Sequence, residues 1–545
     1  MAENTLADTV RQAIRQPRSL QVSALPLFYP IVEALGLRQV VNQLCPTQAD
    51  LDLGLVLLGL VLNRLLAPRP LYQVNQWVEQ SVLCLSLDLD PRQWYDQRLG
   101  RALDALYAHL GELWARLVIR AIQVWQLDLS ILHWDITSFY FTGAYTDSRL
   151  LRRGYSRDQR PDTKQINLEA DVTHGTRVPI GYRVLPGQTA DITTPPEHLA
   201  ALLRLLARPE LVALNVHPLL VSDCKLLTPE AVQGCAQHQL FYLGPLADGL
   251  AVRRVLRSVS EDELAQHELA YRPKRQAQRA DFIAYRGVWR AFTFQVKGLA
   301  APEAAPGKTE RFSARVLVVW SAGKARLDVQ KRRTYLKRLL DGLERIRRQL
   351  NRGRYAARDY VVEQLAQVRR GNPAKRLVSV ELQGSDGQLR LSFHLDRERV
   401  AAAQALDGRY ALATNAEHLS ADAALSIFKA QDDVEKQFSA VKGPLAVRPM
   451  FLHTDERIEG LVCVNLLALL VRAILGLQCQ QAGLRLSLQR LLAEFAAWQA
   501  IDLTLRNGEH VVQLTTPSRT HIQVLNALGV PSCERYLTTL PVVQG

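Results

Sequence analysis

The segment Ile131–Phe141 constrains the fold of this chain more than any other. It consists mostly of β-branched and aromatic residues, which is typical of a strand, and it contains a single acid, Asp135. A carboxylate in the middle of such a strand is unfavourable unless something binds it. The sequence therefore predicts a strand whose acid belongs to a site.

A second apolar run, Val216–Asp223, ends on an acid. A strand that ends in Asp delivers a carboxylate to the carboxyl edge of a sheet, where α/β folds place their ligands. Between the two acids the pattern predicts two strands antiparallel to the first and then a helix. The predicted segments are strands Gln165–Thr173 and Arg177–Leu185, helix Thr194–Leu206 and, after Asp223, a helix from Pro229 and strand Gln239–Leu243.

The run Ser420–Lys442 is predicted to form one amphipathic helix that ends at Gly443. Spacings of three and four residues bring five of its side chains onto one face, namely Phe428, Gln431, Glu435, Phe438 and Lys442. Two aromatics, a lysine and a carboxylate in one stripe fit DNA together with a catalytic metal ion. For Phe428 the alternative to stacking on a base is packing in a core.

The spacing of the acids predicts an interrupted core. Asp223 and Glu435 are 212 residues apart, far more than a compact core needs between its last strand and its final helix. We therefore expect a large insertion from about residue 245 to residue 410. It is predicted to hold strands at residues 280–296 and 311–320, a hairpin of Leu377–Leu382 and Leu389–Leu395, and a returning strand at residues 407–415.

A basic helical stretch, Lys324–Arg370, lies inside this insertion. It holds 15 Lys and Arg residues against 5 Asp and Glu residues. Such an imbalance favours a surface that follows DNA phosphates over an ordinary solvated face. The whole chain has a net charge of +14, which indicates a polyanionic partner; a basic protein without a special ligand is the alternative.

At 545 residues the chain is too long for one core. The predicted fold class is multidomain α+β, with a helical N-terminal domain (1–127), the first part of an α/β core (128–244), the insertion (245–410), the second part of the core with the Glu435 helix (411–500) and a C-terminal tail (501–545). The N-terminal domain is expected either to bind DNA through a helix in a groove or to serve packing and dimerisation. No role is predicted for the tail.

Cysteine usage and hydropathy predict where the protein resides. Seven cysteines include no CxxC pair, so neither a zinc site nor a disulfide framework is predicted, and the odd number suits a reducing compartment. The N-terminal residues are too polar for a signal peptide, and we expect a cytoplasmic protein. The apolar runs Leu53–Leu62 and Leu461–Val471 are shorter than the ~20 residues of a span, so both are predicted to be buried helices away from any membrane.

At its three acids the chain resembles bacterial insertion-sequence transposases of the DDE superfamily, in the group whose third acid lies in the signature Tyr-x2-Arg-x3-Glu-x6-Lys. The signature here reads Phe428, Gln431, Glu435 and Lys442, so the Glu and the Lys match while the Tyr and the Arg do not. The resemblance covers roughly residues 20 to 475 and includes the stretches Leu60–Tyr72, Gly154–Gln165, Leu185–Asp191 and Arg448–Ile458.

The resemblance implies a ribonuclease-H-like core in which Asp135, Asp223 and Glu435 are catalytic and hold two Mg²⁺ ions, with Mn²⁺ as a substitute. Carboxylates without His or Cys ligands also suit such hard cations on chemical grounds. The implied activity is DNA cleavage and strand transfer of the cut-and-paste type, on terminal inverted repeats and target DNA. The implied assembly on DNA is a homodimer.

The resemblance also implies DNA contacts near the cleavage site by Phe428, Gln431 and Lys442. The further residues expected to touch DNA are Lys164, Arg160 and Arg448. His133 lies two residues before Asp135 and so on the same side of the strand, where it either supports the metal site or is an ordinary core histidine. Because Phe428 lacks the hydroxyl and Gln431 the charge of the signature, a hairpin step at the cut ends is left open.

Two alternatives remain beside the transposase hypothesis. One is a non-catalytic DNA-binding derivative of a transposase, against which the three intact acids argue. The other is a ribonuclease-H-like nuclease without strand transfer, against which the basic insertion argues, because a simple nuclease core does not need one.

Overall fold

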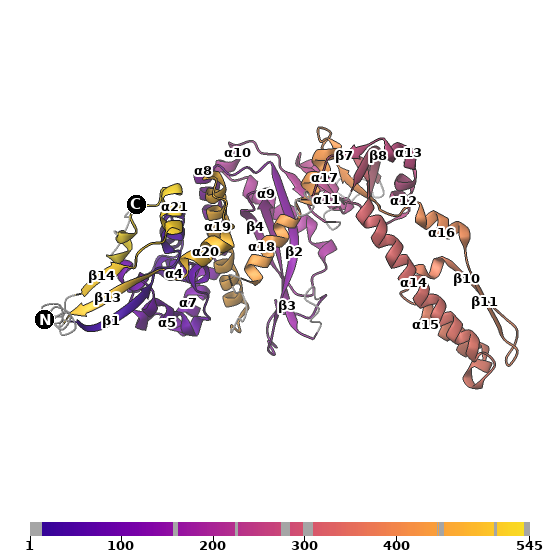
Figure 1. Cartoon of the computed structure of the whole chain (residues 1–545), viewed down its shortest axis with the longest axis horizontal. Helices are drawn as coiled ribbons and strands as arrows, with labels where there is room; N and C mark the ends of the chain where they lie inside the picture. The colour runs from indigo at the N-terminus through magenta and orange to yellow at the C-terminus, as the bar shows by residue number, and fades with distance from the viewer. Residues whose placement is uncertain are drawn as a thin grey trace, which may run out of the picture. The chain divides into compact units, whose positions relative to one another are not determined.

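The computed structural model describes residues 14–155, 162–223, 227–273, 284–297, 309–443, 445, 452–505 and 510–538. The chain divides into two compact units. Unit 1 comprises residues 1–221 and 430–545, and unit 2 comprises residues 222–429. Each unit contains both helices and strands, in agreement with the predicted α+β class (Figure 1).

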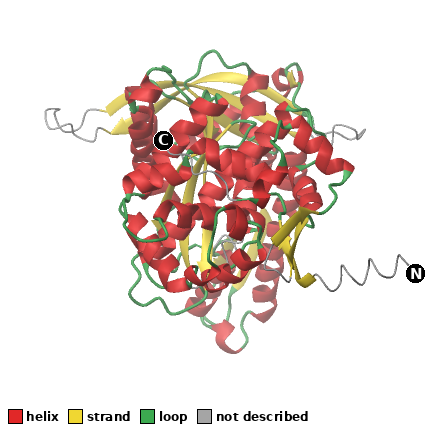
Figure 2. Cartoon of the chain, turned by 90° about the vertical axis from the view of Figure 1, so that its left-hand side faces the viewer, coloured by secondary structure: helices red, strands yellow, loops and turns green. Residues whose placement is uncertain are grey.

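The first part of unit 1 is mainly helical, as predicted for residues 1–127. Its helices are α2 (Leu25–Leu35), α3 (Leu37–Leu44), α4 (Leu53–Leu66), α5 (Val74–Gln80), α6 (Leu83–Ser86), α7 (Asp96–Tyr107) and α8 (Leu110–Trp125), with short turns η1 (Leu71–Gln73) and η2 (Pro91–Gln93). Helices make up most of what Figure 2 shows of this part. Asp52 begins α4, because its carboxylate accepts a hydrogen bond from the Leu55 N–H at 2.7 Å.

One long apolar helix from the C-terminal half packs with these helices. It is α19 (Asp455–Gln481), which contacts α2, α4, α7 and α8. By length and composition it could cross a membrane, but 89% of its most apolar window is buried inside the protein. The prediction of a buried helix over Leu461–Val471 is therefore confirmed, and packing on all sides accounts for its apolar character.

The two ends of the chain meet in a small sheet. Strand β1 (Ile14–Gln21) pairs antiparallel with β13 (Gln499–Leu505), which pairs with β14 (His510–Leu514). The sequence predicted only helices in the first 127 residues, so β1 was missed; its partner lies almost the whole chain away and leaves no local signal. The remaining elements of this end are α20 (Leu488–Phe495), α21 (Arg519–Ala527) and η6 (Cys533–Leu537).

The predicted three-stranded meander is confirmed in unit 1. Strands β2 (Ile131–Phe141), β3 (Lys164–Thr173) and β4 (Pro179–Pro186) pair antiparallel in turn. The chain then forms η3 (Asp191–Thr193), α9 (Pro195–Leu206), α10 (Pro209–Val212) and β5 (Leu219–Val221). β5 pairs parallel with β2, so the strand order within unit 1 is β4-β3-β2-β5.

Strand β2 is covered on both faces, and this explains its continuous apolar sequence. On one face the Trp134 ring stacks on His198 of α9, with the ring centres 4.6 Å apart. On the other face lies α18 (Asp432–Lys442), which Figure 1 shows beside β2. Residues of β2 alternate between the two faces, so His133, Asp135 and Phe139 share the face toward α18.

Unit 2 contains an antiparallel sheet built mostly from the predicted insertion. Its strands, in spatial order, are β6 (Phe241–Pro245), β12 (Arg409–Thr414), β9 (Thr309–Ser321), β8 (Tyr285–Lys297) and β7 (Glu268–Leu269). The helices beside it are α11 (Pro229–Gln237), α12 (Leu250–Arg257), α13 (Glu261–Ala265) and α17 (Ala421–Lys429). The returning strand expected at residues 407–415 is β12, which lies between β6 and β9.

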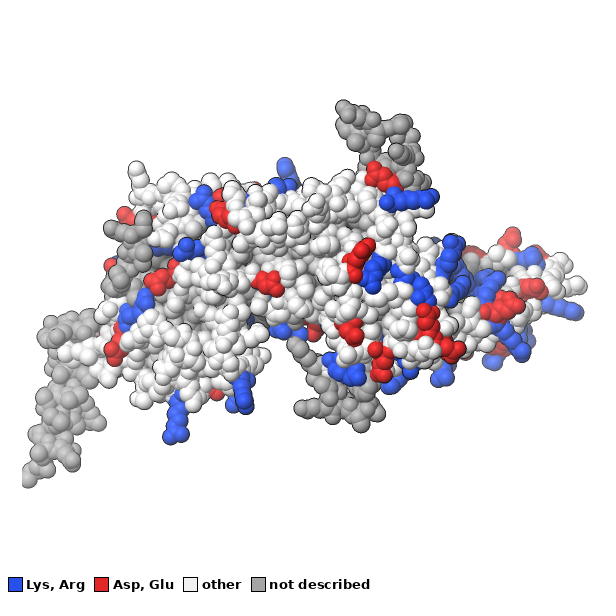
Figure 3. Space-filling model, turned by 90° about the horizontal axis from the view of Figure 1, so that it is seen from above, with Lys and Arg blue, Asp and Glu red and all other residues white. Residues whose placement is uncertain are grey.

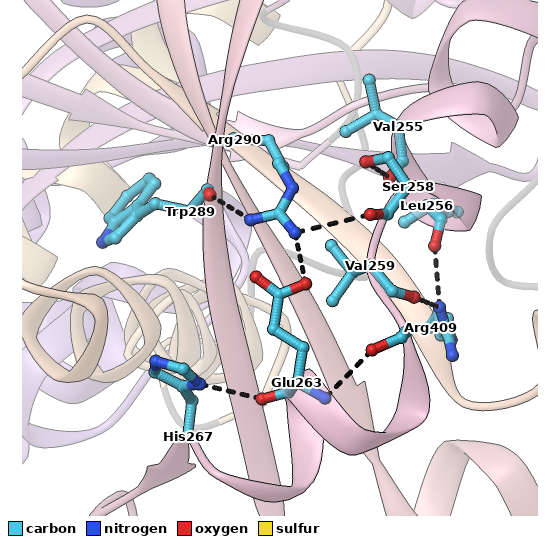
Figure 4. A network of polar contacts seen from close by, with 10 residues as sticks. Val255, Leu256, Ser258, Val259, Glu263, His267, Trp289, Arg290 and Arg409 are labelled. Carbon is cyan, nitrogen blue, oxygen red and sulfur yellow. Dashed lines mark hydrogen bonds and ion pairs between the residues drawn. The ribbon is translucent and has the colours of Figure 1, made fainter.

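Two arginines, Arg290 and Arg409, connect the small helices of unit 2 to this sheet (Figure 4). Arg409 of β12 donates to the carbonyl oxygens of Leu256 at 2.8 Å and Val259 at 2.5 Å. These groups lie at the end of α12, where helix carbonyls lack partners within the helix. Arg290 of β8 pairs with Glu263 of α13.

The basic part of unit 2 has a core of its own. The predicted stretch Lys324–Arg370 forms α14 (Ala322–Gln349) and α15 (Arg358–Arg369), and the predicted hairpin forms β10 (Val378–Gln383) and β11 (Arg390–Leu395). The turns η4 (Gly353–Ala356) and η5 (Pro373–Arg376) and helix α16 (Arg397–Gln404) complete it. Leu339, Leu343, Val361 and Leu391 are among the residues buried between the helices and the hairpin.

Candidate functional site

The predicted helix Ser420–Lys442 is two helices in the structure. α17 ends at Lys429, and α18 begins at Asp432 after a turn at Ala430 and Gln431. α17 packs on β6 and β8 of unit 2, whereas α18 packs on β2, β3 and α19 of unit 1. The prediction of one continuous helix was wrong because these two segments have different packing partners, which override helix propensity.

The stripe of side chains is consequently shorter than predicted. Phe428 belongs to α17 and does not share a helical face with Glu435. Gln431, Glu435, Phe438 and Lys442 keep their common face on α18 because the backbone of Gln431 is already helical. Phe438 is buried, Gln431 and Lys442 are partly buried and Glu435 is exposed.

Gln431 fastens the beginning of α18 to β2. Its side-chain Nε2 donates to the Trp134 carbonyl at 2.8 Å, and its Oε1 is 3.0 Å from Nδ1 of His133. An amide oxygen can only accept, so Nδ1 of His133 carries the proton. In neutral His133 the other ring nitrogen then accepts from Nδ1 of His174 at 2.9 Å. The three side chains form one hydrogen-bond chain that connects His174 to the Trp134 carbonyl.

Lys442 contacts β2 at the other end of α18. Its ammonium lies 5.5 Å from the centre of the Phe139 ring. The beginning of α18 thus lies beside His133 and its end beside Phe139, so the helix and the strand run in the same direction. From Gln431 to Lys442 the helix advances eleven residues, about 16 Å, and from His133 to Phe139 the strand advances six residues, about 20 Å. The two lengths are similar, as expected for a helix that runs along the strand.

From these two contacts we infer that Glu435 lies near the level of Asp135. Glu435 follows Gln431 by four residues, about 6 Å along the helix and about 40° around it. Asp135 follows His133 by two residues, about 6.6 Å along the strand and on the same face. By this estimate Glu435 and Asp135 each lie about 6 Å along their own element from the Gln431–His133 contact, in the direction of the Lys442–Phe139 contact.

The two acids differ in exposure. Asp135 is partly buried, and its Oδ1 accepts a hydrogen bond from the Ile136 N–H at 2.7 Å. Glu435 is exposed, at the rim of the face that α18 turns toward β2. The Asp135 side chain is thus partly shielded from solvent, whereas the Glu435 side chain is exposed to it.

Asp223 belongs to unit 2, two residues after the end of β5. Among the residues that the structure describes, no three His, Cys, Asp or Glu side chains are grouped so as to hold a metal ion. The convergence of Asp223 with the other two acids stays a prediction.

Three comparisons with known proteins add little information on the function of the chain. The model of a domain of unknown function (DUF4277) matches residues 18–119. No curated protein sequence matches the chain. Among solved structures, a cryo-EM structure of a piggyBac transposase synaptic complex with hairpin DNA is similar at 9% identity and a TM-score of 0.38, over 97% of this chain and 89% of that chain. A likeness this distant bears on neither the fold nor the function of the chain.

The remaining residues predicted to bind DNA have various surroundings. Phe428 is partly buried with its ring centre 6.5 Å from that of Tyr410, so it makes a packing contact within unit 2. Lys164 donates from Nζ to the Tyr145 carbonyl at 2.7 Å. Arg160 and Arg448 lie outside the described residues. DNA binding by all of these residues, and by Gln431 and Lys442, stays a prediction.

The sequence did not single out His174, Gln437 or Phe139. Gln437 donates from Nε2 to the Arg177 carbonyl at 2.6 Å and so fastens α18 to the turn between β3 and β4. For His174 a signal existed, because antiparallel pairing of the predicted strands brings the residue after Thr173 next to the beginning of β2. Nothing in the sequence indicated which residues of the late helix would meet it.

The face of β2 and β3 that is turned away from α18 holds a cluster of buried charges. Glu169 is 0% exposed and Asp171 is 3% exposed. His198 Nε2 lies 3.0 Å from Asp171, and Arg183 pairs with Glu169 at 3.2 Å. Burial raises the pKa of Glu169, and the nearby His198 and Arg183 oppose this rise. The contacts of His198 and Arg183 with these two carboxylates connect α9 and β4 to β3 on the side opposite α18.

Proposed function

We propose that the chain is a DDE-type transposase, an enzyme that cuts DNA at transposon ends and joins the freed 3′ ends to target DNA. The observation that carries the proposal is the pair of contacts that Gln431 and Lys442 of α18 make with His133 and Phe139 of β2, from which we infer that Glu435 lies near Asp135. The sequence resemblance around Asp135, Asp223 and Glu435 supports it. Because two transposon ends must be held together, we expect at least a dimer on DNA.

The pairing of β5 with β2 supports Asp223 as the third acid. Val221 of β5 lies beside His133 of β2 in the parallel register. Asp135 follows His133 by two residues within β2, and Asp223 follows Val221 by two residues beyond the end of β5. Consecutive Cα atoms are about 3.8 Å apart, so Asp223 stays within about 8 Å of the residue that is paired with His133.

The donor chemistry of these acids fits Mg²⁺, with Mn²⁺ as a substitute, since carboxylate oxygens are the ligands that such hard cations prefer. Asp135, Asp223 and Glu435 would hold the ions. A bound pair of Mg²⁺ ions supplies activation of the attacking oxygen and stabilisation of the leaving oxygen during in-line displacement at phosphorus.

The work left to the protein is positioning, because phosphoryl transfer needs little covalent chemistry from side chains. The strand fixes Asp135, and the anchored helix fixes Glu435. Lys442 lies two turns beyond Glu435 on the same face, where its ammonium can neutralise a phosphate beside the scissile bond.

The proposal is tested by a joining assay. Purified protein with Mg²⁺ is incubated with plasmid DNA and a labelled duplex taken from the DNA that flanks its own gene. We expect covalent joining of the labelled 3′ end to the plasmid, and none in EDTA. Cleavage without joining would indicate a nuclease, and binding without either reaction would indicate a non-catalytic derivative; each outcome contradicts the proposal.

Helix α14 offers a surface for duplex DNA. Lys331, Arg338 and Arg345 are exposed, follow one another at two-turn intervals of about 10 Å, and form no ion pair with a described carboxylate. By contrast, Arg332 pairs with Asp407. Figure 3 shows Lys and Arg side chains, with some Asp and Glu, over the part of the chain that Figure 1 labels α14 and α15.

Replacing Lys331, Arg338 and Arg345 together by Gln is expected to weaken duplex binding and to flatten its dependence on salt. Each lost phosphate contact removes about 0.9 from the slope of log K against log salt, so the slope should fall by up to about 2.7. Binding titrations at several salt concentrations measure it. Three exposed arginines of unit 1, Arg204, Arg485 and Arg490, provide a control with the same loss of charge. An unchanged slope would remove this surface from the proposal.

A further inference from the structure

Unit 2 contains a cleft of about 900 Å³ that the proposed chemistry does not use. Its walls come from α12, the beginning of α14, η5, α16 and β12. Seven of the side chains that line it are Lys or Arg, and one is an acid, Asp248. Three other cavities among the described residues have linings in which acids and cations are more nearly balanced.

Three of these cations are neutralised locally. Arg253 pairs with Asp248, Lys324 pairs with Asp328 at 2.6 Å, and Arg399 pairs with Asp396 at 2.9 Å. A fourth, Arg409, is buried and occupied by the carbonyls at the end of α12. These four cations therefore have roles inside unit 2.

The other three cations are available to a ligand. Arg257, Lys375 and Arg376 are exposed, and none forms an ion pair with a described carboxylate. Arg257 ends α12, and Lys375 and Arg376 end η5, so two separate elements direct positive charge at the same cleft. Charged side chains that serve only to keep a protein soluble have no need to point from separate elements into the same cleft.

Apolar groups form the rest of the lining. They include Val252 and Leu256 of α12, Leu377, Leu406 and Tyr410. Low-dielectric walls strengthen the field of the cations between them. A lining of cations, aliphatic groups and one aromatic ring suits a ligand that carries several phosphates joined by less polar units.

We infer that this cleft binds the backbone of a single DNA strand. The choice of DNA rests on the proposed function, whereas the choice of a multiply charged phosphate ligand rests on the lining. The volume lies near the upper end of the 300–1,000 Å³ range of ligand sites, which gives room for a few nucleotides. A concave cleft suits a strand, while the exposed face of α14 suits a duplex. A strand released at a cut transposon end is the ligand that the proposed reaction supplies.

The test is binding of fluorescent oligo(dT), followed by anisotropy, with full-length protein carrying Asp135→Asn so that no DNA is cut. Replacing Arg257, Lys375 and Arg376 together by Gln is expected to weaken binding about tenfold and to lower the salt slope by about 2, at 0.7 per contact on single strands. The Lys331, Arg338 and Arg345 triple has the same loss of charge and should leave oligo(dT) binding nearly unchanged. Equal losses in both triples, or no loss in the first, would overturn the inference.

A competition experiment separates a strand from a smaller phosphate ligand. Inorganic tripolyphosphate should displace oligo(dT) only weakly, because it is smaller than the oligonucleotide and contacts fewer cations of the cleft. Tight binding of tripolyphosphate that depends on the same three cations, with oligo(dT) binding unaffected by their loss, would assign the cleft to a small anion instead. Thermal unfolding of both triples checks that these exposed substitutions leave the fold intact.

The binding result and the joining result are independent. If oligo(dT) binding depends on the cleft cations but the protein joins no DNA ends, the strand-binding role of the cleft is supported and the transposase function is rejected. If joining is normal but oligo(dT) binding does not depend on the cleft cations, the transposase function is supported and the strand-binding role is rejected.

Discussion

Glu435→Gln should abolish joining of DNA ends while leaving duplex binding within about twofold. The substitution keeps the size of the side chain and removes its negative charge, and with it the preference for Mg²⁺. Removal of one such stabilising group typically lowers rates by about 10² to 10³. Duplex affinity should persist because we place it on the cations of α14 and on Lys442.

Asp432→Asn provides a matched control on the same helix. Asp432 is exposed and pairs with Lys436 at 2.6 Å, a contact that leaves the face toward β2 unchanged. It should join DNA at the normal rate. Asp135→Asn and Asp223→Asn should be as inactive as Glu435→Gln. Full activity of Glu435→Gln would show that the site is elsewhere, and full activity of Asp223→Asn alone would require a different third acid.

Gln431→Ala should slow joining about 10- to 100-fold with little change in DNA affinity. The side chain bonds to His133 and to the Trp134 carbonyl, so its loss frees the beginning of α18, one turn before Glu435. Loss of a group that orients a ligand of a metal site typically has an effect of this size. If Gln431 contacted DNA instead, as the family resemblance implies, the substitution would raise the dissociation constant of DNA rather than lower the rate.

The His133→Ala variant distinguishes this positioning role from a general loss of stability. It should show the same defect, and combining it with Gln431→Ala should add little, because both substitutions break the same contact. Ser439→Ala is the control at an exposed residue of α18 whose hydroxyl donates to the Glu435 carbonyl at 2.9 Å. Strictly additive effects of His133→Ala and Gln431→Ala would contradict the shared role.

Local patterns predicted the elements that carry the candidate site. The strand with Asp135, the two strands after it, the helix at residues 195–206 and the returning strand at residues 409–414 all lie within a few residues of their expected bounds. These segments were predictable because each has a strong period of its own and is bounded by turn residues. The insertion followed from counting residues between the acids.

The failures occur where a segment depends on a distant partner. The strand at residues 14–21 pairs with residues 499–505, and no local window contains both. The break at Ala430 and Gln431 has neither proline nor glycine to mark it. It exists because the two helices beside it pack in different units.

The sequence by itself determined the local structure around each candidate acid: Asp135 in a strand, Asp223 after a strand and Glu435 on a helix. Only the tertiary structure decided that the Gln431 and Lys442 side chains contact β2, so that α18 lies along this strand. Periodicity determines the face of an element on which a side chain lies. The position along a strand at which a helix packs is instead set by long-range contacts, which here are the hydrogen bonds of Gln431 and the contact of the Lys442 ammonium with the Phe139 ring.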